Sequence, residues 1–208
     1  MENPFSMPLD EAMRSQRAMR YLQPDPVDDE LLLQLVDLAI RAPSGRNAQN
    51  WHFVFLKDRS KLARLATLNR RGACLYRWLN RDQSSPMARS FLHQAEHFKE
   101  IPVVMVACQR GWYLPGPLLY SASFFASIFP AVQNFLLAAR AAGLGTTLIT
   151  IPLWNSWALS RLLELPWGVV PCALVPLGWP AREFGTNRRQ PAGHSFHLDR
   201  FGHQPFLE

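Results

Sequence analysis

The feature that most constrains this chain is a long, almost uncharged stretch in its middle. Between Gly111 and Ser160, Arg140 is the only charged side chain. The stretch is long enough for two membrane-spanning helices, but prolines, glycines and polar residues leave no window of about 18 clean apolar residues. We therefore predict a buried helix and a buried strand and no membrane insertion. A helix that is apolar all round in so small a protein is expected to pack against a second subunit.

Composition narrows the class of protein further. The chain has 208 residues, of which 48% are hydrophobic and 18% charged, so one domain over 1–208 with its own core is expected. The net charge of +6 would suit an anionic partner, yet no Lys/Arg run exceeds two residues, so nucleic-acid binding is not expected. Three cysteines without CxxC spacing, and histidines without HExxH spacing, predict neither a disulfide framework nor a metal site. No signal peptide is recognised, so a cytoplasmic location is expected.

Hydrophobic periodicity predicts a mixture of helices and short strands. Helices are expected over 9–19, 28–42, 58–69, 88–99, 123–142 and 157–165. Strands are expected over 51–56, 101–108, 146–151 and 171–177. Residues 70–90 are interpreted as irregular. Strict βαβ alternation, GxGxxG and GxxxxGK[ST] are all missing from the sequence, so the pattern indicates an α+β fold and gives no support to dinucleotide-binding or P-loop folds.

Four segments, in this order, resemble the nitroreductase family. Arg-Ala-Met-Arg at 17–20 is similar to the family's Arg-x-Ser-x-Arg element, and Pro-Ser-Gly-Arg-Asn-Ala-Gln-Asn-Trp at 43–51 is similar to its Pro-Ser-x-x-Asn-x-Gln-Pro-Trp loop. The segment 130–146 resembles the family's central interface helix and the turn after it. The segment 177–191 resembles its Gly-Tyr-Pro strand end and phosphate-binding arm. The first and third segments look like an Arg-Ala-Met-Arg, actinobacterial-type subgroup.

The resemblance implies a fold, a cofactor and an assembly. The fold would be three-layered, with a mostly antiparallel central sheet flanked by helices. The chain would form an intertwined homodimer in which a C-terminal arm, about 180–208, lies on the partner. FMN would be tightly bound at two interface sites that each use both subunits, and NAD(P)H would donate electrons. The residues implied in cofactor binding are Arg17, Ala18, Met19, Arg20, Pro43, Ser44, Gly45, Arg46, Asn47, Gln49, Thr147, Leu148, Thr150, Arg188 and Arg189.

The residue types suit the parts of FMN. Its dianionic phosphate needs cations in fork geometry, which Arg17, Arg20 and either Arg188 or Arg189 could supply. The amides of Asn47 and Gln49 could pair with the ring's polar edge. Two plainer interpretations stay open: the first two arginines could form one solvated helix face, and the loop could be an ordinary polar turn.

Hydride chemistry takes place at flavin N5, so no catalytic side chain, nucleophile or metal is expected. Backbone N–H groups around Thr150 and Ile151 are the candidates beside N5, and Arg20 is a candidate beside N1 and O2. The alternative for this threonine-rich segment is simple strand propensity. The chain departs from the family pattern at Ala18, at Asn50 and at Thr150–Ile151, where relatives have Ser, Pro and Glu-Gly. These departures concern substrate and nicotinamide preference more than FMN binding.

Three functions remain in view. The first is a ping-pong transfer of hydride from NAD(P)H to a nitroaromatic, a quinone or a similar electron-poor acceptor. The second is a different redox reaction on the same flavin-binding fold, because fold does not fix function. The third is a non-enzymatic basic binding protein. The segment 70–122 carries no motif and is expected to cover the pocket that decides between the first two.

Overall fold

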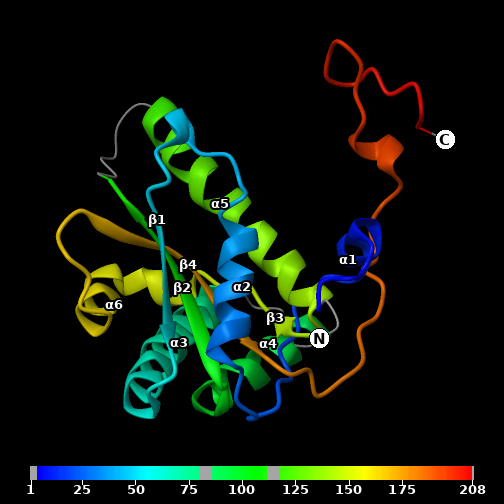
Figure 1. The fold of residues 1–208 in the computed structure, drawn as a ribbon. Coiled ribbons are helices and arrows are strands. Elements are labelled where there is room, and N and C mark those ends of the chain that lie inside the picture. The colour runs from blue at the N-terminus through cyan, green and yellow to red at the C-terminus, as the bar shows by residue number, and fades with distance from the viewer. Residues whose placement is uncertain (1–3, 80–85, 112–117, 208) are drawn as a thin grey trace.

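The computed structural model describes residues 4–79, 86–111 and 118–207 of the chain (Figure 1). Helices surround one antiparallel sheet whose strand order is β1-β2-β4-β3, which confirms the predicted α+β class. The elements are α1 (Leu9–Ser15), α2 (Asp29–Ala39), η1 (Gly45–Asn47), β1 (Trp51–Leu56), α3 (Arg59–Leu79), α4 (Pro86–Glu96), η2 (Phe98–Glu100), β2 (Val103–Arg110), α5 (Leu118–Ala141), β3 (Gly145–Thr146), η3 (Ile151–Asn155), α6 (Ser156–Leu162), β4 (Val169–Gly178) and η4 (Ala192–Ser195).

The sheet separates two hydrophobic clusters, which confirms the three-layer architecture. Successive side chains of a strand point to opposite faces, and β2 shows this directly. Val103 and Met105 pack with α2 and α5 on one face, whereas Val104 and Val106 pack with α3 and α6 on the other. Both faces of β2 are covered, so its apolar run lacks the alternation of a half-exposed strand.

Helix α2 begins where the sequence predicts. The carboxylate of Asp28 accepts a hydrogen bond from the Glu30 N–H at 3.0 Å, so it caps the helix. Val27 and Leu32 on either side of the cap are both buried in the same cluster, as expected of a hydrophobic staple. The helix ends at Ala39, three residues before the predicted end.

Helix α5 is the central helix, and it starts five residues earlier than predicted. Gly143 (φ 80°) ends it, and the Leu144 N–H donates to the Ala139 carbonyl at 2.8 Å, as in a Schellman cap. Pro130 lies inside the helix. The span Ser121–Ala141 is long and apolar enough to cross a membrane, but half of its most apolar window is buried within the fold, as in the core helix of a soluble protein.

Two predictions of local structure are wrong. Residues 70–79 are not irregular, because α3 continues to Leu79, and α4 already begins at Pro86; residues 80–85 lie outside the described part. The many arginines there hide any apolar stripe, although Arg, Leu and Ala all favour helix. The expected helix over 9–19 ends at Ser15, because Ala18 forms a bridge with Thr146.

The predicted strand over 146–151 also fails beyond its first residue. Only Gly145 and Thr146 pair as β3, and the chain then turns into η3, in which Pro152 occupies the first turn. Helix α3 packs tightly against η3 at Gly72. A Cβ atom added there would lie 2.5 Å from Trp154 Cδ1 and 2.7 Å from Ile151 Cγ2, which is too close for a side chain. The Trp154 indole donates to the Leu68 carbonyl at 3.1 Å. Packing thus overrides the β-branched propensity.

The contact at Gly72 generates a prediction about stability. Ala has the higher helix propensity by about 1 kcal/mol, but overpacking against Trp154 and Ile151 costs about 1–3 kcal/mol. We expect Gly72→Ala to lower the free energy of unfolding in urea by about 1 kcal/mol net. In a Trp154→Ala background the same change should be neutral or stabilising. Greater stability of the single variant than of the wild type would contradict this packing.

Candidate functional site

The segment after α1 carries the first pair of predicted arginines along β3. The Met19 N–H donates to the Thr146 carbonyl at 2.8 Å, and the Thr147 hydroxyl donates to the Met19 carbonyl at 2.7 Å. Met19 is buried, so its neighbours on the extended chain are held at the surface of the fold. This placement is not the solvated helix face that an i, i+3 spacing could also indicate.

The two arginines form a local excess of positive charge. Burial and the neighbouring Arg17 lower the pKa of Arg20. Neither guanidinium forms an ion pair with a carboxylate in the described part of the chain. Arg17 is exposed, whereas Arg20 is partly buried, and a partly buried charge beside a like charge is unfavourable unless an anion compensates it. The arrangement is therefore suited to binding an anion.

The chain segment before Arg188 and Arg189 lies against Arg17 and the end of α1. A Cβ added at Gly185 would lie 3.2 Å from Arg17 Nη1. The Asn187 amide donates to the carbonyls of Met13 and Gln16 at 3.0 and 3.1 Å. The two arginines that follow are exposed, so the structure brings opposite ends of the chain together without deciding which of them would face an anion.

The predicted loop 43–49 is exposed and conformationally unusual. Arg46, Asn47 and Gln49 all have positive φ, between 49° and 55°. Such backbone is uncommon outside glycine and costs free energy, so three cases within four residues indicate a loop held in a specific shape. The Ser44 hydroxyl accepts from the Gln49 N–H at 3.1 Å, and the Gly45 N–H donates to the Ser127 hydroxyl at 3.2 Å.

Within one chain, the loop contacts α5 near the middle of the helix, and the arginine segment lies beside its C-terminal end. Ser127 contacts the loop, whereas Arg140 donates to the Ser15 hydroxyl at 2.9 Å beside the arginine segment. At 1.5 Å per residue, these two positions are about 20 Å apart along the helix. One chain thus does not bring the two halves of the predicted site together.

The segment 147–151 offers backbone donors close to the arginines. Thr147 and Ile149 donate their N–H groups to the carbonyls of Pro176 and Leu174. The N–H groups of Leu148 and Thr150 have no backbone acceptor among the described residues. Thr147 is buried, Ile151 is half-buried, and Leu148 and Thr150 are exposed. The predicted donors beside N5 are therefore available at an accessible turn.

A stack of side chains that the sequence did not reveal borders this region. The Arg182 guanidinium lies 3.4 Å from the Tyr21 ring centroid, and the other stacking partner of Tyr21 is the His93 ring at 4.1 Å. Burial first, then His97 and Arg182, lower the pKa of His93, which favours the neutral ring. The stack fixes the residue directly after Arg20. Only the tertiary fold joins its members, which come from three distant segments.

These groups fit the cofactor that the resemblance implies. Unpaired guanidinium groups suit a phosphate, and open N–H groups suit the polar edge of a ring. Among the described residues, the buried Gln94 Nε2, next to His93 on α4, has no hydrogen-bond partner. Buried polar atoms are normally paired, so an unpaired one calls for an explanation such as a ligand.

Two of the three free cysteines, Cys108 and Cys172, are buried, whereas Cys74 on α3 is exposed. Burial raises the pKa of Cys108 and of Cys172 to about 12, so both thiols stay protonated and unreactive at neutral pH. The described part of the chain contains no group of three or more His, Cys, Asp or Glu side chains that could hold a metal ion.

Comparison with known proteins decides the family. The family model described as "Nitroreductase family" matches residues 13–179, which is most of the chain. The chain belongs to the nitroreductase family. It is an oxidoreductase of the nitroreductase type. A putative NADH dehydrogenase/NAD(P)H nitroreductase of Methanothermobacter thermautotrophicus is 28% identical over 180 residues, covering 85% of this chain and 79% of the relative.

Solved structures confirm the nitroreductase fold. The BluB-like flavoprotein from Clostridium difficile 630 superposes with a TM-score of 0.74 at 21% identity, covering 94% of this chain and all of the other. Oxidized iodotyrosine deiodinase, solved with FMN and 3-iodo-L-tyrosine, gives a TM-score of 0.72 at 20% identity, covering 88% and 96%. At these identities the likeness establishes the fold alone.

The unpaired arginines generate a prediction about anion binding. Inorganic phosphate should raise the thermal midpoint of the wild type, by the equivalent of about 1.4 kcal/mol at ten times its Kd. Arg20→Gln should lose this response. Without phosphate it should be as stable as the wild type, or more stable by at most about 1 kcal/mol, because a like-charge repulsion is removed. Arg64→Gln, at an exposed arginine of α3, is the matched control. Equal phosphate responses in all three proteins would exclude an anion site here.

Proposed function

We propose that this protein is an FMN-dependent oxidoreductase that passes hydride from NAD(P)H to a nitroaromatic, a quinone or a similar electron-poor acceptor by a ping-pong mechanism. The observation that carries the proposal is the pair Arg17 and Arg20, which lack a carboxylate partner among the described residues, beside the segment that leads to Arg188 and Arg189. The family membership supports the redox chemistry.

Each part of the site has a separate task in this proposal. Arg17, Arg20 and one of Arg188 and Arg189 hold the phosphate through charge-assisted hydrogen bonds. The N–H groups of Leu148 and Thr150 donate to the polar edge of the ring, where negative charge develops. FMN, when bound, supplies hydride acceptance and donation at N5. The amides of Asn47 and Gln49 complete the ring's surroundings from a second chain.

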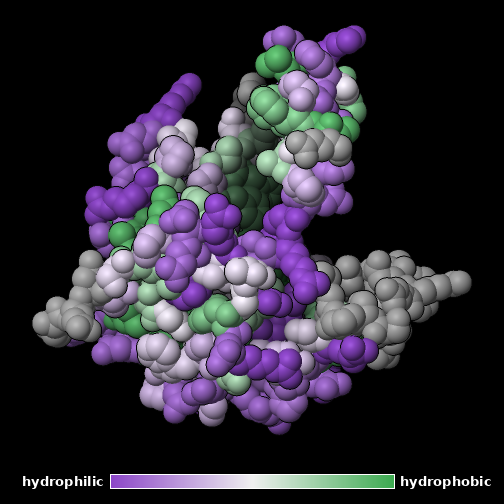
Figure 2. All heavy atoms as spheres, turned by 90° about the vertical axis from the view of Figure 1, so that its right-hand side faces the viewer, coloured by the Kyte–Doolittle hydropathy of each residue, from purple (hydrophilic) through white to green (hydrophobic). Residues whose placement is uncertain are grey.

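A homodimer is part of the proposal. The loop and the arginine segment contact α5 at positions about 20 Å apart, and this separation supports a site whose two halves come from different chains. The arm packs on its own chain as far as Asn187 and then extends away from the body (Figure 1), and its last part carries the exposed Phe201 and Phe206. Figure 2 also shows a hollow between this arm and the body. Exposed aromatic side chains of this kind mark interaction surfaces, and a second copy is the occupant we propose.

A different redox reaction at the same site is the second candidate function, because proteins with this fold include one with another activity. A deiodinase solved with FMN shares this fold. In this chain Thr150 and Ile151 would lie beside the proposed ring, where the family pattern has Glu-Gly. Reduction kinetics distinguish the two functions, since a nitroreductase-type cycle begins with rapid reduction by a nicotinamide. A cytoplasmic location and the lack of nucleic-acid binding stay predictions.

The proposal predicts a coloured protein. The purified chain, or the chain incubated with FMN, should show flavin absorption bands in the visible range, and stopped-flow mixing with NADH or NADPH should bleach them. Arg17→Gln and Arg20→Gln should each weaken FMN binding about tenfold, because each removes a charged hydrogen bond worth about 1.5–3 kcal/mol. A protein that takes up no FMN would refute the proposal. One that binds FMN but is reduced by neither nicotinamide would favour the second reaction.

The shared site predicts complementation between inactive variants. Arg20→Gln and Asn47→Ala should each lower the number of competent FMN sites. If each site takes its arginines from one chain and its loop from the other, unfolding and refolding the two together should restore about one quarter of the sites by random pairing. Sites built within one chain would give no recovery. A monomer in multi-angle light scattering would also contradict the assembly.

A further inference from the structure

The segment 179–185, which leads into the C-terminal arm, runs antiparallel to the arginine segment. Leu22 pairs with Pro180 in an antiparallel bridge, and backbone hydrogen bonds of 3.0 and 2.8 Å join the residues on either side of that pair. Each step back along one segment is a step forward along the other. Two steps from the bridge, this register places Arg182 across from Arg20.

Arg182 adds a third guanidinium to this region. Further along the two segments, a Cβ added at Gly185 would lie 3.2 Å from Arg17 Nη1, so the segments stay side by side. Arg182 is exposed, and in the described part of the chain neither it nor its neighbour Glu183 forms an ion pair. Cations gathered without a counter-charge favour the binding of an anion.

An aromatic ring holds the Arg182 guanidinium in place. Its central carbon lies 3.4 Å from the Tyr21 ring centroid, and the His93 ring lies 4.1 Å from the same centroid at an interplanar angle of 23°. Two flat groups this close to one ring centre cannot share a face, so the Tyr21 ring is sandwiched between them. The His97 ring extends the stack, 4.3 Å from that of His93. Three distant parts of the chain thus fix where the guanidinium lies.

The stack leaves the N–H groups of Arg182 open to a ligand. So close to the Tyr21 ring, a guanidinium must lie nearly parallel to it, because a tilted one would press an amino group into the ring. Its N–H groups then point outwards in the fork geometry that matches two oxygens of a phosphate. Burial first, then His97 and Arg182, lower the pKa of His93. The opposite face of Tyr21 is therefore covered by a neutral ring and not by a second cation.

We propose that Arg182 is a further anion-binding residue of the site, positioned by Tyr21 and His93, and that it binds a phosphate monoester. The source of that group is the phosphate of FMN or the 2′-phosphate of a nicotinamide donor, because both present the same kind of oxygens. Naming these two sources rests on the proposed function, whereas the binding of inorganic phosphate does not.

A thermal-shift titration with inorganic phosphate tests the residue, on the full chain after removal of any bound flavin. Arg182→Gln should weaken phosphate binding about fivefold, because an exposed charge pair contributes modestly. Arg182→Lys keeps the charge but cannot lie flat on the ring, so it should recover only part of the loss. Equal phosphate affinity in Arg182→Gln and the wild type overturns the proposal.

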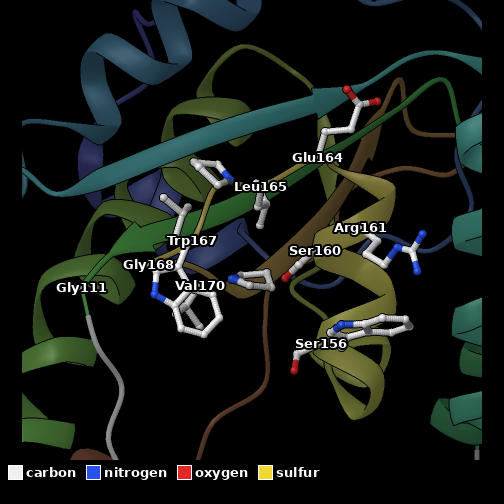
Figure 3. A pocket seen from close by; sticks show the side chains of 13 residues that line it. Gly111, Ser156, Ser160, Arg161, Glu164, Leu165, Trp167, Gly168 and Val170 are labelled. Atoms are coloured by element: carbon white, nitrogen blue, oxygen red, sulfur yellow. The ribbon is translucent and has the colours of Figure 1, made fainter.

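Arg161→Gln is the matched control. Arg161 is also an exposed arginine over an aromatic ring, with its central carbon 4.9 Å from the Trp157 ring centroid. It borders a hollow lined by α6, Gly111, the turn after α6 and the start of β4 (Figure 3), and not the arginine segment. This variant should bind phosphate as the wild type does. A loss equal to that of Arg182→Gln would overturn the assignment to Arg182.

Variants of Tyr21 test the positioning role. Tyr21→Leu removes the ring and should weaken phosphate binding about threefold, whereas Tyr21→Phe keeps the ring and should bind as the wild type does. In an Arg182→Gln background, Tyr21→Leu should cause no further loss, because its effect passes through Arg182. Equal losses in both backgrounds would overturn the positioning role. Far-UV circular dichroism verifies that each variant is folded.

Two matched pairs of ligands identify the source of the phosphate. FMN differs from riboflavin, and NADP⁺ from NAD⁺, by one phosphate group. If Arg182→Gln weakens FMN but not riboflavin, the residue binds the cofactor; if it weakens NADP⁺ but not NAD⁺ in calorimetry of the FMN-loaded chain, it binds the donor. A change in neither pair overturns the proposal. A chain that binds phosphate through Arg182 but is reduced by neither nicotinamide contradicts the proposed nicotinamide reaction alone.

Discussion

The candidate site depends on one short pairing, in which the extended segment after α1 lies along β3. Two hydrogen bonds make it, from the Met19 N–H to Thr146 and from the Thr147 hydroxyl back to Met19. Each is worth about 1 kcal/mol net, but a buried group left unpaired would cost more. The pairing therefore fixes the register of the segment. Through the parallel bridge of Ala18 with Thr146, it places the arginine segment beside β3, directly before the segment 147–151.

Neighbouring elements hold this pairing from several sides. The stack of Arg182, Tyr21 and His93 fixes the residue after Arg20, while Asn187 fastens the C-terminal segment to the end of α1. Gly72 lets α3 approach η3, so the turn at 147–151 has a firm support. A site whose backbone is fixed by such contacts has its geometry before a ligand binds. Less conformational entropy is then lost on binding.

Helix α5 is the main reason for proposing a site shared by two chains. It is both the core helix of the fold and the spacer between the strained loop at 43–49 and the arginines. A rigid helix keeps these two contact positions about 20 Å apart, which supports the proposal that the ligand lies between two copies of the chain.

The sequence by itself determined the local elements and the class of the protein. The Asp28 cap, the Gly143 stop and the apolar runs of β1, β2 and β4 follow from residue chemistry over a few neighbours, and the ordered motifs indicated the family. Local patterns failed where packing between distant segments decides. The continuation of α3 past residue 70 and the turn at 147–151 both depend on tertiary contacts such as that of Gly72 with Trp154. The tertiary structure also decided that Arg17 lies beside Gly185, that Tyr21 stacks on His93, and that the loop and the arginine segment contact α5 at positions about 20 Å apart. These are distances between residues far apart in the chain, and no periodicity encodes them.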